Sequence, residues 1–137
     1  MSWLFEEQIV DDVDPSFVGF VYLITNKLNG KKYIGKKLLQ FRKTKKVKGK
    51  TKKVLVESDW KTYFGSNAEL NEDVKQFGAE NFTRTVLKFC KSKGECSYFE
   101  AKYQFEFDVL LKPEEYYNSW VMVKVRRSHL SKILNTK

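Results

Sequence analysis

The pair Asn29-Gly30 stands between two runs of strand-forming residues, and it constrains the fold more than any other feature of the sequence. The first run, Phe17–Thr25, is rich in β-branched and aromatic residues, and the second run is Lys31–Leu38. Asn-Gly is the dipeptide most typical of the tight turns that join antiparallel strands. The sequence therefore predicts a β-hairpin over residues 17–38.

The register of this hairpin places two tyrosines on the same face of the sheet. A two-residue turn pairs Tyr22 with Lys37, and a four-residue turn shifts the pairing by two residues, so both keep Tyr22 and Tyr33 on one face. The opposite face, which we expect to contact the core, carries Val21, Leu23 and Ile34. The tyrosines are then either ordinary strand formers on a half-exposed surface or a functional pair beside lysines.

The remaining pattern indicates an α+β domain, with a small three-stranded antiparallel sheet flanked by helices. A third strand is expected over Asn81–Cys90, and a further strand over Trp120–Val125. Apolar residues at helical spacing predict the longest helix over Gly94–Leu111, closed by Pro113. Shorter helices are expected over Ser58–Gly65 and Ala68–Gln76.

Positive charge is concentrated in one part of the chain, whose net charge is +9. No Asp or Glu occurs between Pro15 and Val56, whereas thirteen of the 26 Lys and Arg residues do. Such a one-signed block usually meets a polyanion. Within it, the low-complexity run Lys43–Lys53 is either a solvated, flexible loop or a set of lysines that follow a phosphate backbone.

The expected organisation is an acidic, irregular lead-in over residues 1–14, one domain over 15–122 with a basic insertion at about 43–57, and a basic tail over 123–137. Hydrophobic residues make up 42% of the chain, which is enough for a core and excludes a disordered basic tail. No apolar run approaches the ~18–20 residues that span a bilayer, and the acidic start is unlike a signal peptide. We therefore expect a protein that acts in the cytoplasm without membrane contact.

The two cysteines and the single histidine exclude a standard four-ligand zinc site. Without an export signal, Cys90 and Cys96 are expected to be ordinary thiols. A different candidate ligand is Glu100, which lies beside the apolar stripe of the predicted long helix. That position fits either a boundary residue or a buried metal ligand.

The order of these parts resembles the GIY-YIG endonuclease family. The first motif stands here as Phe20-Val21-Tyr22 and the second as Tyr33-Ile34-Gly35, with ten residues between the two tyrosines. The basic residue that the family places after the second motif corresponds to Arg42 or Lys43, the helix glutamate to Glu100, and the late asparagine to Asn118 in Tyr117-Asn118. The resemblance covers roughly residues 17–118, and it is greatest to small nucleases encoded by bacteriophages, which implies the cytoplasm of the host cell.

The resemblance implies a DNA endonuclease that hydrolyses phosphodiester bonds with one divalent metal, Mg²⁺ or Mn²⁺, held by Glu100. Tyr22 would act as the general base or position the attacking water, and Tyr33 would help to orient the water or the phosphate. Arg42 would stabilise charge that develops on the phosphate, and Asn118 would support the site by hydrogen bonding. Supporting roles would fall to Lys36, Lys37, Lys43 and Tyr63.

The sequence also departs from the family pattern. Many members carry a histidine after the arginine, whereas this chain has none before His129, so that role is vacant or taken by Tyr63 or Lys61. Phosphate contacts are expected from Lys45, Lys46, Lys48, Lys50, Lys52, Lys53, Arg126 and Arg127. Sequence recognition would rest on the insertion, on the ends or on formation of a homodimer.

Two other readings stay open beside the endonuclease. A non-catalytic DNA-binding or inhibitory protein with the same fold fits the basic span and the missing histidine. A ribosome-type RNA-binding protein fits the charge but not the arrangement of tyrosines and glutamate.

Overall fold

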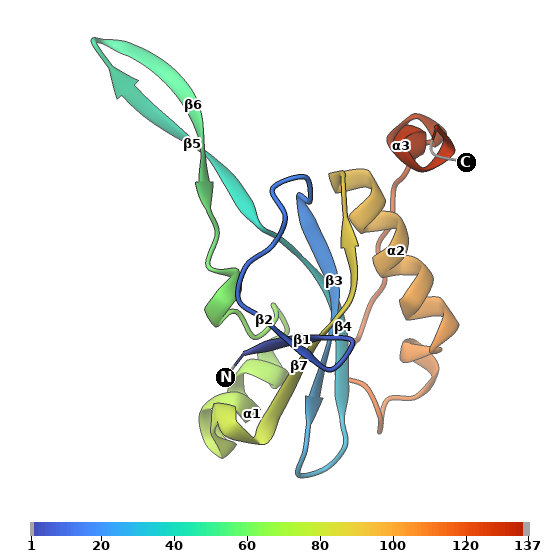
Figure 1. Cartoon of the computed structure of the whole chain (residues 1–137). Helices are drawn as coiled ribbons and strands as arrows, with labels where there is room; N and C mark the ends of the chain where they lie inside the picture. Colours follow the sequence, from blue (N-terminus) through green and yellow to red (C-terminus); the bar gives the residue numbers. More distant parts are fainter. Residues whose placement is uncertain (1, 136–137) are drawn as a thin grey trace.

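The computed structural model describes residues 2–135 of the chain, and its main sheet has five strands in the order β2-β1-β7-β3-β4 (Figure 1). These strands are β1 Trp3–Phe5, β2 Gln8–Val10, β3 Gly19–Asn26, β4 Lys32–Leu38 and β7 Phe82–Cys90. A separate two-stranded sheet, β5 Gln40–Val47 and β6 Lys50–Glu57, projects from the body. The helices are α1 Ala68–Phe77, α2 Lys93–Glu106 and α3 Ser131–Leu134, and the 3-10 turns are η1 Trp60–Thr62, η2 Ala79–Asn81, η3 Val109–Leu111 and η4 Arg127–Leu130.

The centre of the sheet confirms the predicted α+β class, because β7, β3 and β4 pair antiparallel. The sheet is larger than expected, since β1 adds to β7 in parallel and β2 pairs with β1. The prediction of an irregular start was therefore wrong for Trp3–Val10. Two three-residue strands carry too little alternation to be recognised from sequence.

The hairpin of β3 and β4 takes the four-residue turn, because Tyr22 pairs with Gly35 and not with Lys37. Two main-chain hydrogen bonds close the turn, from Asn26 N–H to the Lys31 carbonyl and from Gly30 N–H to the Asn26 carbonyl. Gly30 has φ +77°, a left-handed conformation that glycine adopts without strain. The parity is unchanged, so Tyr22 and Tyr33 share a face as predicted.

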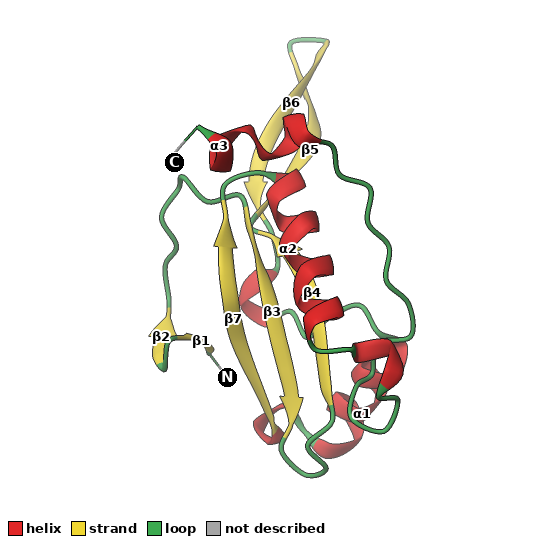
Figure 2. Ribbon diagram, turned by 90° about the vertical axis from the view of Figure 1, so that its right-hand side faces the viewer, coloured by secondary structure: helices red, strands yellow, loops and turns green. Residues whose placement is uncertain are grey.

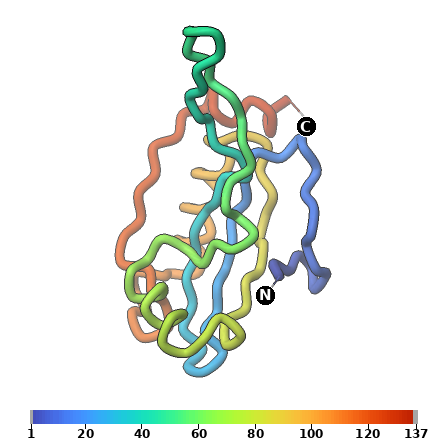
Figure 3. Tube along the Cα trace, turned by 90° about the vertical axis from the view of Figure 1, so that its left-hand side faces the viewer, coloured from blue at the N-terminus to red at the C-terminus, as the bar shows by residue number. Residues whose placement is uncertain are grey.

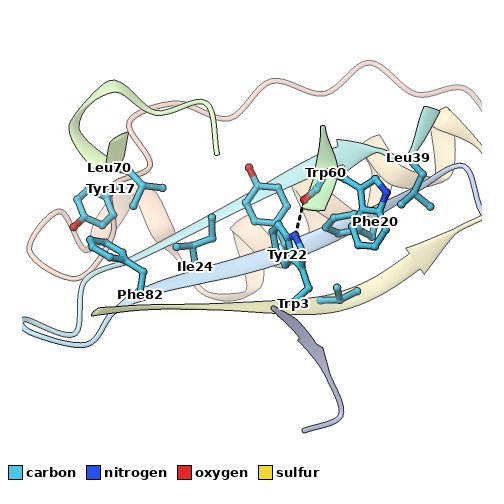
Figure 4. Packing of buried hydrophobic residues seen from close by; sticks show 10 residues of the cluster. Trp3, Phe20, Tyr22, Ile24, Leu39, Trp60, Leu70, Phe82 and Tyr117 are labelled. Carbon is cyan, nitrogen blue, oxygen red and sulfur yellow. Dashed lines mark hydrogen bonds between the residues drawn. The ribbon is translucent and has the colours of Figure 1, made fainter. Parts of the chain in front are cut away.

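Both faces of the sheet are covered, so the alternative in which Tyr22 is an ordinary strand former on a half-exposed surface is wrong. Helix α2 covers one face, where Val21 and Ile34 pack with the two free thiols Cys90 and Cys96 (Figure 2). Residues 58–77 cover the other face (Figure 3). Tyr22 is only 1% exposed and packs there in an aromatic cluster with Trp3, Phe20 and Trp60 (Figure 4).

Element boundaries differ from the prediction where side chains compete with the helix pattern. The predicted helix over residues 58–65 is reduced to η1, which follows Asp59, while the Ser58 hydroxyl donates to the Leu38 carbonyl and accepts from the Trp60 N–H. Helix α2 ends at Glu106, since Asp108 adopts a left-handed conformation with φ +53°. Helix α1 and its C-terminal Gly78 are confirmed. Residues 120–125, all within the described part, form no strand.

The basic insertion is a hairpin and not a flexible loop, since its eight residue pairs run from Gln40↔Glu57 to Val47↔Lys50. Among residues 2–135, no helix has the length and apolar character needed to cross a membrane.

Candidate active site

Three tyrosines meet above the centre of β3 and β4. The ring of Tyr22 lies 6.2 Å from that of Tyr33 and 6.0 Å from that of Tyr63, measured between centroids. The hydroxyl groups of Tyr22 and Tyr63 share a hydrogen bond, and the hydroxyl of Tyr33 lies 3.2 Å from Ser66 Oγ. Figure 4 shows the Tyr22 hydroxyl pointing away from the packed tryptophan and phenylalanine rings. The buried ring therefore presents its hydroxyl to the neighbouring tyrosines.

Two glycines leave room for this hydroxyl. A Cβ added at Gly35 would overlap the Tyr22 hydroxyl and would lie 2.9 Å from the Tyr33 ring. Gly65 has φ +87°, and a Cβ there would lie 3.4 Å from the Tyr22 hydroxyl. The glycine of the second motif is thus required because the tyrosine of the first motif lies across it.

Burial raises the pKa of the two motif tyrosines. Desolvation is the largest cause that raises the pKa of Tyr22 well above its ordinary value, and Tyr63, Tyr33 and Glu100 raise it further. Desolvation also raises the pKa of Tyr33. In the free protein both phenols are therefore neutral at physiological pH.

Glu100 reaches the same site from the other face of the sheet. It lies on α2, half-buried, and its carboxylate accepts a hydrogen bond from the backbone N–H of Lys36 on β4. Its negative charge raises the pKa of both Tyr22 and Tyr33, which places it within electrostatic reach of the two hydroxyls. Desolvation raises the pKa of Glu100 itself, while the Lys36 ammonium opposes this rise. Lys36 Nζ in turn donates to Ser97 Oγ at 2.6 Å.

Asn118 holds the second motif by its main chain. Its Oδ1 accepts from Ile34 N–H at 3.0 Å, and its Nδ2 donates to the Ile34 carbonyl at 2.8 Å. Gln104 of α2 also donates to that carbonyl, at 3.0 Å. The neighbouring Tyr117 is anchored through its hydroxyl, which donates to Asp73 and accepts from Asn26.

These contacts all fall on the outer edge of β4, the last strand of the sheet. The main-chain groups of Lys32 bond to Glu115 and Tyr117, those of Ile34 bond to Asn118, and that of Lys36 bonds to Glu100. Every second residue of an edge strand directs its backbone groups outward, so these three residues offer N–H and carbonyl groups to partners outside the sheet. The edge strand thereby joins Glu100 and Asn118 to the two tyrosine motifs.

Lys37 is a cation in direct contact with the tyrosine cluster. Its side chain is 10% exposed, and its ammonium lies 3.9 Å from the centroid of Tyr63 and 2.6 Å from Asp59 Oδ1. Tyr63, which the sequence offered in place of histidine, thus contacts both Tyr22 and Lys37. Lys61, the other candidate, is directed to Glu57 and to the Trp60 ring instead.

The structure does not place Arg42 or Lys43 on a helix beside the tyrosines. Both are exposed residues of β5, near the base of the projecting hairpin. The insertion lysines Lys45, Lys46, Lys48, Lys50, Lys52 and Lys53 are exposed along the same hairpin. Arg126 and Arg127 lie where η4 begins, and Arg127 lines a pocket with Tyr98 and Leu134.

Several residues of the site were not found by sequence reasoning. Ser66 and Gly65 follow Tyr63 in the run Trp60–Asn67, whose density of aromatic, glycine and polar residues was the available signal. Asp59 and Gln104 gave no signal, since single polar residues at such positions are common. Arg84 is 2% exposed between the rings of Trp3 and Phe64, and it donates to the Tyr63 carbonyl at 2.9 Å. It thereby fixes the backbone that carries Tyr63.

The donor set limits which metal site is feasible. Within residues 2–135, no group of three or more His, Cys, Asp or Glu side chains comes together. A single carboxylate such as that of Glu100 suits an ion such as Mg²⁺, because this ion keeps several waters and is commonly held by one or two carboxylates plus phosphate oxygens. The residues present therefore fit a cation whose coordination shell would be completed by the substrate. They do not fit a structural metal site in which the protein supplies every ligand.

Comparison with known proteins agrees with this arrangement. A family model described as "Putative endonuclease segE, GIY-YIG domain" matches residues 3–121. A protein of Enterobacteria phage T4 named "Putative endonuclease segE" is 33% identical over 103 residues, which cover 72% of this chain and 39% of that protein. The chain therefore matches well under half the length of this relative. No solved structure matches the chain significantly.

Proposed function

The chain belongs to the segE group of GIY-YIG endonucleases, and from this premise we propose that it is a metal-dependent endonuclease that hydrolyses phosphodiester bonds of DNA. The observation that carries the proposal is that Tyr22 and Tyr33 lie side by side and that the charge of Glu100, which is bonded to the edge strand β4, acts on both hydroxyls. These three residues come from both motifs and from a separate helix.

Glu100 would hold the divalent cation, Mg²⁺ or Mn²⁺, together with water and an oxygen of the scissile phosphate. Such a cation would stabilise negative charge on the phosphate and would lower the cost of charge on the Tyr22 oxygen. The backbone N–H of Lys36 orients the carboxylate. The Glu100 side chain is thus fixed by the strand that also carries Tyr33.

Tyr22 would position the attacking water, and after losing its own phenolic proton to bulk water it would take up a proton from the attacking water. Burial keeps its hydroxyl protonated in the free protein, so proton transfer has to follow binding of substrate and cation. The hydrogen bond to Tyr63 holds the Tyr22 hydroxyl in one orientation. Tyr33, next to Ser66, would orient the water or a phosphate oxygen.

Lys37 is better placed than Arg42 to stabilise charge on the phosphate at this site. Its ammonium is held against Tyr63 by Asp59, whereas Arg42 lies on the projecting hairpin. Asn118 would act as a positioning residue, because its amide holds the backbone of Ile34 between Tyr33 and Gly35.

The test is cleavage of supercoiled plasmid with Mg²⁺ or Mn²⁺. We expect the wild type to nick or linearise the plasmid, and Glu100→Gln, Tyr22→Phe and an EDTA control to leave it intact. Tyr98→Phe is the matched control, because Tyr98 lies on α2 and is 40% exposed. We expect this variant to cut the plasmid as the wild type does. Undiminished cutting by Glu100→Gln would overturn the role of the carboxylate.

A second candidate is a DNA-binding protein that does not cut, and the location of Arg42 away from the tyrosines favours it. The same assay separates the two. A wild type that shifts the plasmid on a gel but leaves it intact with either metal would support the binding protein and contradict the endonuclease.

A further inference from the structure

A groove separates the base of the projecting hairpin from the body of the protein. Its volume is about 870 Å³, and its walls come from β5 and β6, from the residues that lead into α2, and from α3. Figures 1 and 2 show α3 returning to the end of the molecule from which the hairpin leaves. We call this feature the basic groove, because five of its lining residues are cations: Arg42, Lys43, Lys91, Lys93 and Lys132.

The charges of the basic groove are unbalanced. None of the described residues that line it is an Asp or a Glu. Lys91 acts on one acid outside the lining, Asp14, whose pKa is lowered mainly by Ser16 and least by Lys91. Five cations that share one concave surface repel each other unless an anion lies between them. The groove is therefore complementary to a polyanion.

The walls of the basic groove are fixed by specific contacts and do not depend on chance positions of surface lysines. Lys132 Nζ donates to the Lys91 carbonyl at 3.1 Å, and Ser92 Oγ donates to the His129 carbonyl at 3.3 Å. Gly94 lies directly under His129, so close that a Cβ at Gly94 would overlap that of His129. The C-terminal segment is thus packed on the start of α2, which brings Lys132 to Lys91 and Lys93.

The basic groove lies near the tyrosine cluster but apart from it. Val18 lines the groove and precedes Tyr22 by four residues along an extended strand, which corresponds to about 13 Å. Along duplex DNA, where each strand carries one phosphate per about 3.4 Å of axis, this spans about four base pairs. A duplex whose scissile phosphate lies at Tyr22 can therefore extend its backbone into the groove.

We propose that the basic groove binds the phosphate backbone of duplex DNA that flanks the cleavage site, about four base pairs from the scissile phosphate. The inference rests on the proposed function and adds a second contact region to it. Arg42 and Lys43 then act in binding the flank and not in the chemistry. The segment with Lys91, Lys93 and Lys132 completes the region that the hairpin begins.

The test measures binding to a fluorescein-labelled, mixed-sequence 30-base-pair duplex in EDTA over a series of salt concentrations. The groove variant combines Lys91→Gln, Lys93→Gln and Lys132→Gln. Since each phosphate contact contributes about 0.9 to the slope of log K against log salt, we expect the slope to fall by about two to three. We also expect a loss of affinity of about tenfold or more at 0.1 M salt, with unchanged melting temperature.

The matched control combines Lys27→Gln, Lys75→Gln and Lys112→Gln, which removes the same charge from exposed positions outside the groove. Its slope should stay within 0.5 of the wild type if the groove makes direct contacts. An equal loss in both variants would overturn the inference, because only net charge would then matter. If the wild type cuts plasmid while the groove variant binds like the wild type, the inference fails and the proposed function survives.

A second arm tests an acidic protein segment as the occupant. A labelled polyglutamate peptide is titrated onto wild type and groove variant in the same buffers. Loss of peptide binding with an unchanged DNA slope would overturn the inference in favour of an acidic partner. If the wild type neither binds nor cuts DNA, the proposed function fails and the inference falls with it.

Discussion

Gly35 shows how one residue couples the two tyrosine motifs. Its missing side chain leaves the space in which the Tyr22 hydroxyl lies, next to the ring of Tyr33. The strand pairing brings this about, since Tyr22 and Gly35 are direct partners across β3 and β4. Geometry at the hydroxyl therefore depends on a residue that carries no chemical group of its own.

We expect Gly35→Ala to fold but to cut DNA at least 10²-fold more slowly, because the methyl group pushes the Tyr22 hydroxyl aside by about 1 Å or more. Cleavage rates and circular dichroism measure the two effects. Gly30→Ala is the control, since nothing lies within 4 Å of a Cβ at this position. Any loss of stability in this variant comes only from the backbone conformation of the turn. Equal cleavage rates for Gly35→Ala and Gly30→Ala would contradict a displacement of the Tyr22 hydroxyl by the added methyl group.

The ion pair of Lys37 and Asp59 predicts a pH-dependent contribution to stability. The hydrogen bond from Lys37 lowers the pKa of Asp59 below 3.8, so its contribution is present above the unfolded pKa and is lost as pH falls through the folded pKa. Because the Asp59 side chain is 62% exposed, we expect at most about 0.5 kcal/mol. Melting curves of wild type and Asp59→Asn should differ at pH 6, and the difference should shrink as the pH falls through the pKa of Asp59 in the folded protein. A difference that does not shrink on acidification would point to another cause.

The sequence predicted the position of a residue correctly where the alternation of side chains along a strand determines which face it occupies. It did not predict contacts between segments that are distant in the chain. The shared face of Tyr22 and Tyr33 follows from the hairpin alone. The contacts of Lys37 with Asp59 and Tyr63 depend on how residues 58–66 pack over the sheet, and no local pattern encodes that path.

The hairpin of β5 and β6 is an element that was not predicted from the sequence. Lysine runs usually indicate solvated loops, and Lys45 even pairs directly with Lys52 across the strands, which like charges disfavour. Threonine and valine in both strands supply the β propensity that the charge count hides. Because an anion would relieve the repulsion, DNA binding should stabilise this element more than any other.

The hairpin can be shortened to test its independence. Replacing residues 44–53 by an Asn-Gly turn should change the melting temperature by only a few degrees, since β5 and β6 pair with each other in a sheet of their own. The salt slope of DNA binding should fall by up to about five, because six lysines are removed. A hairpin of full length with the six lysines changed to serine should lose the slope equally. If the salt slope stays at the wild-type value in both variants, the lysines of the hairpin do not contact DNA.

At the scale of the whole molecule, a second core on the Tyr22 face supports the site. Trp3 joins this core from the start of the chain, stacking edge-on against Phe20 and Tyr22 and donating from Nε1 to the Trp60 carbonyl at 2.6 Å. The N-terminal strands are therefore part of the unit that carries the tyrosines.

We expect Trp3→Ala to destabilise the protein by about 3–5 kcal/mol, because it removes a buried indole and leaves a cavity beside Tyr22. Chemical denaturation measures the change. Trp120→Ala is the matched control, since Trp120 is 66% exposed and should cost less than about 0.5 kcal/mol. Similar costs for the two variants would show that the N-terminal strands are dispensable.

The overall architecture was predictable to the extent that its elements are long and periodic. The three central strands, α1 and the body of α2 follow from alternation, caps and helical spacing. The parallel pairing of β1 with β7 joins segments about eighty residues apart through two residue pairs, Trp3↔Arg84 and Leu4↔Thr85. Pairing of such short strands is decided by the core around Trp3 and not by the strands themselves.

The outer edge of β4 has a consequence beyond the site. An open strand edge is a template on which another chain can add a strand, the first step of edge-to-edge aggregation. Here Lys32, Ile34 and Lys36 already bond to Glu115 and Tyr117, to Asn118 and to Glu100. Glu100 and Asn118 thus also keep the long edge of the sheet closed to other chains, so their loss should favour self-association of the protein as well as impair its chemistry.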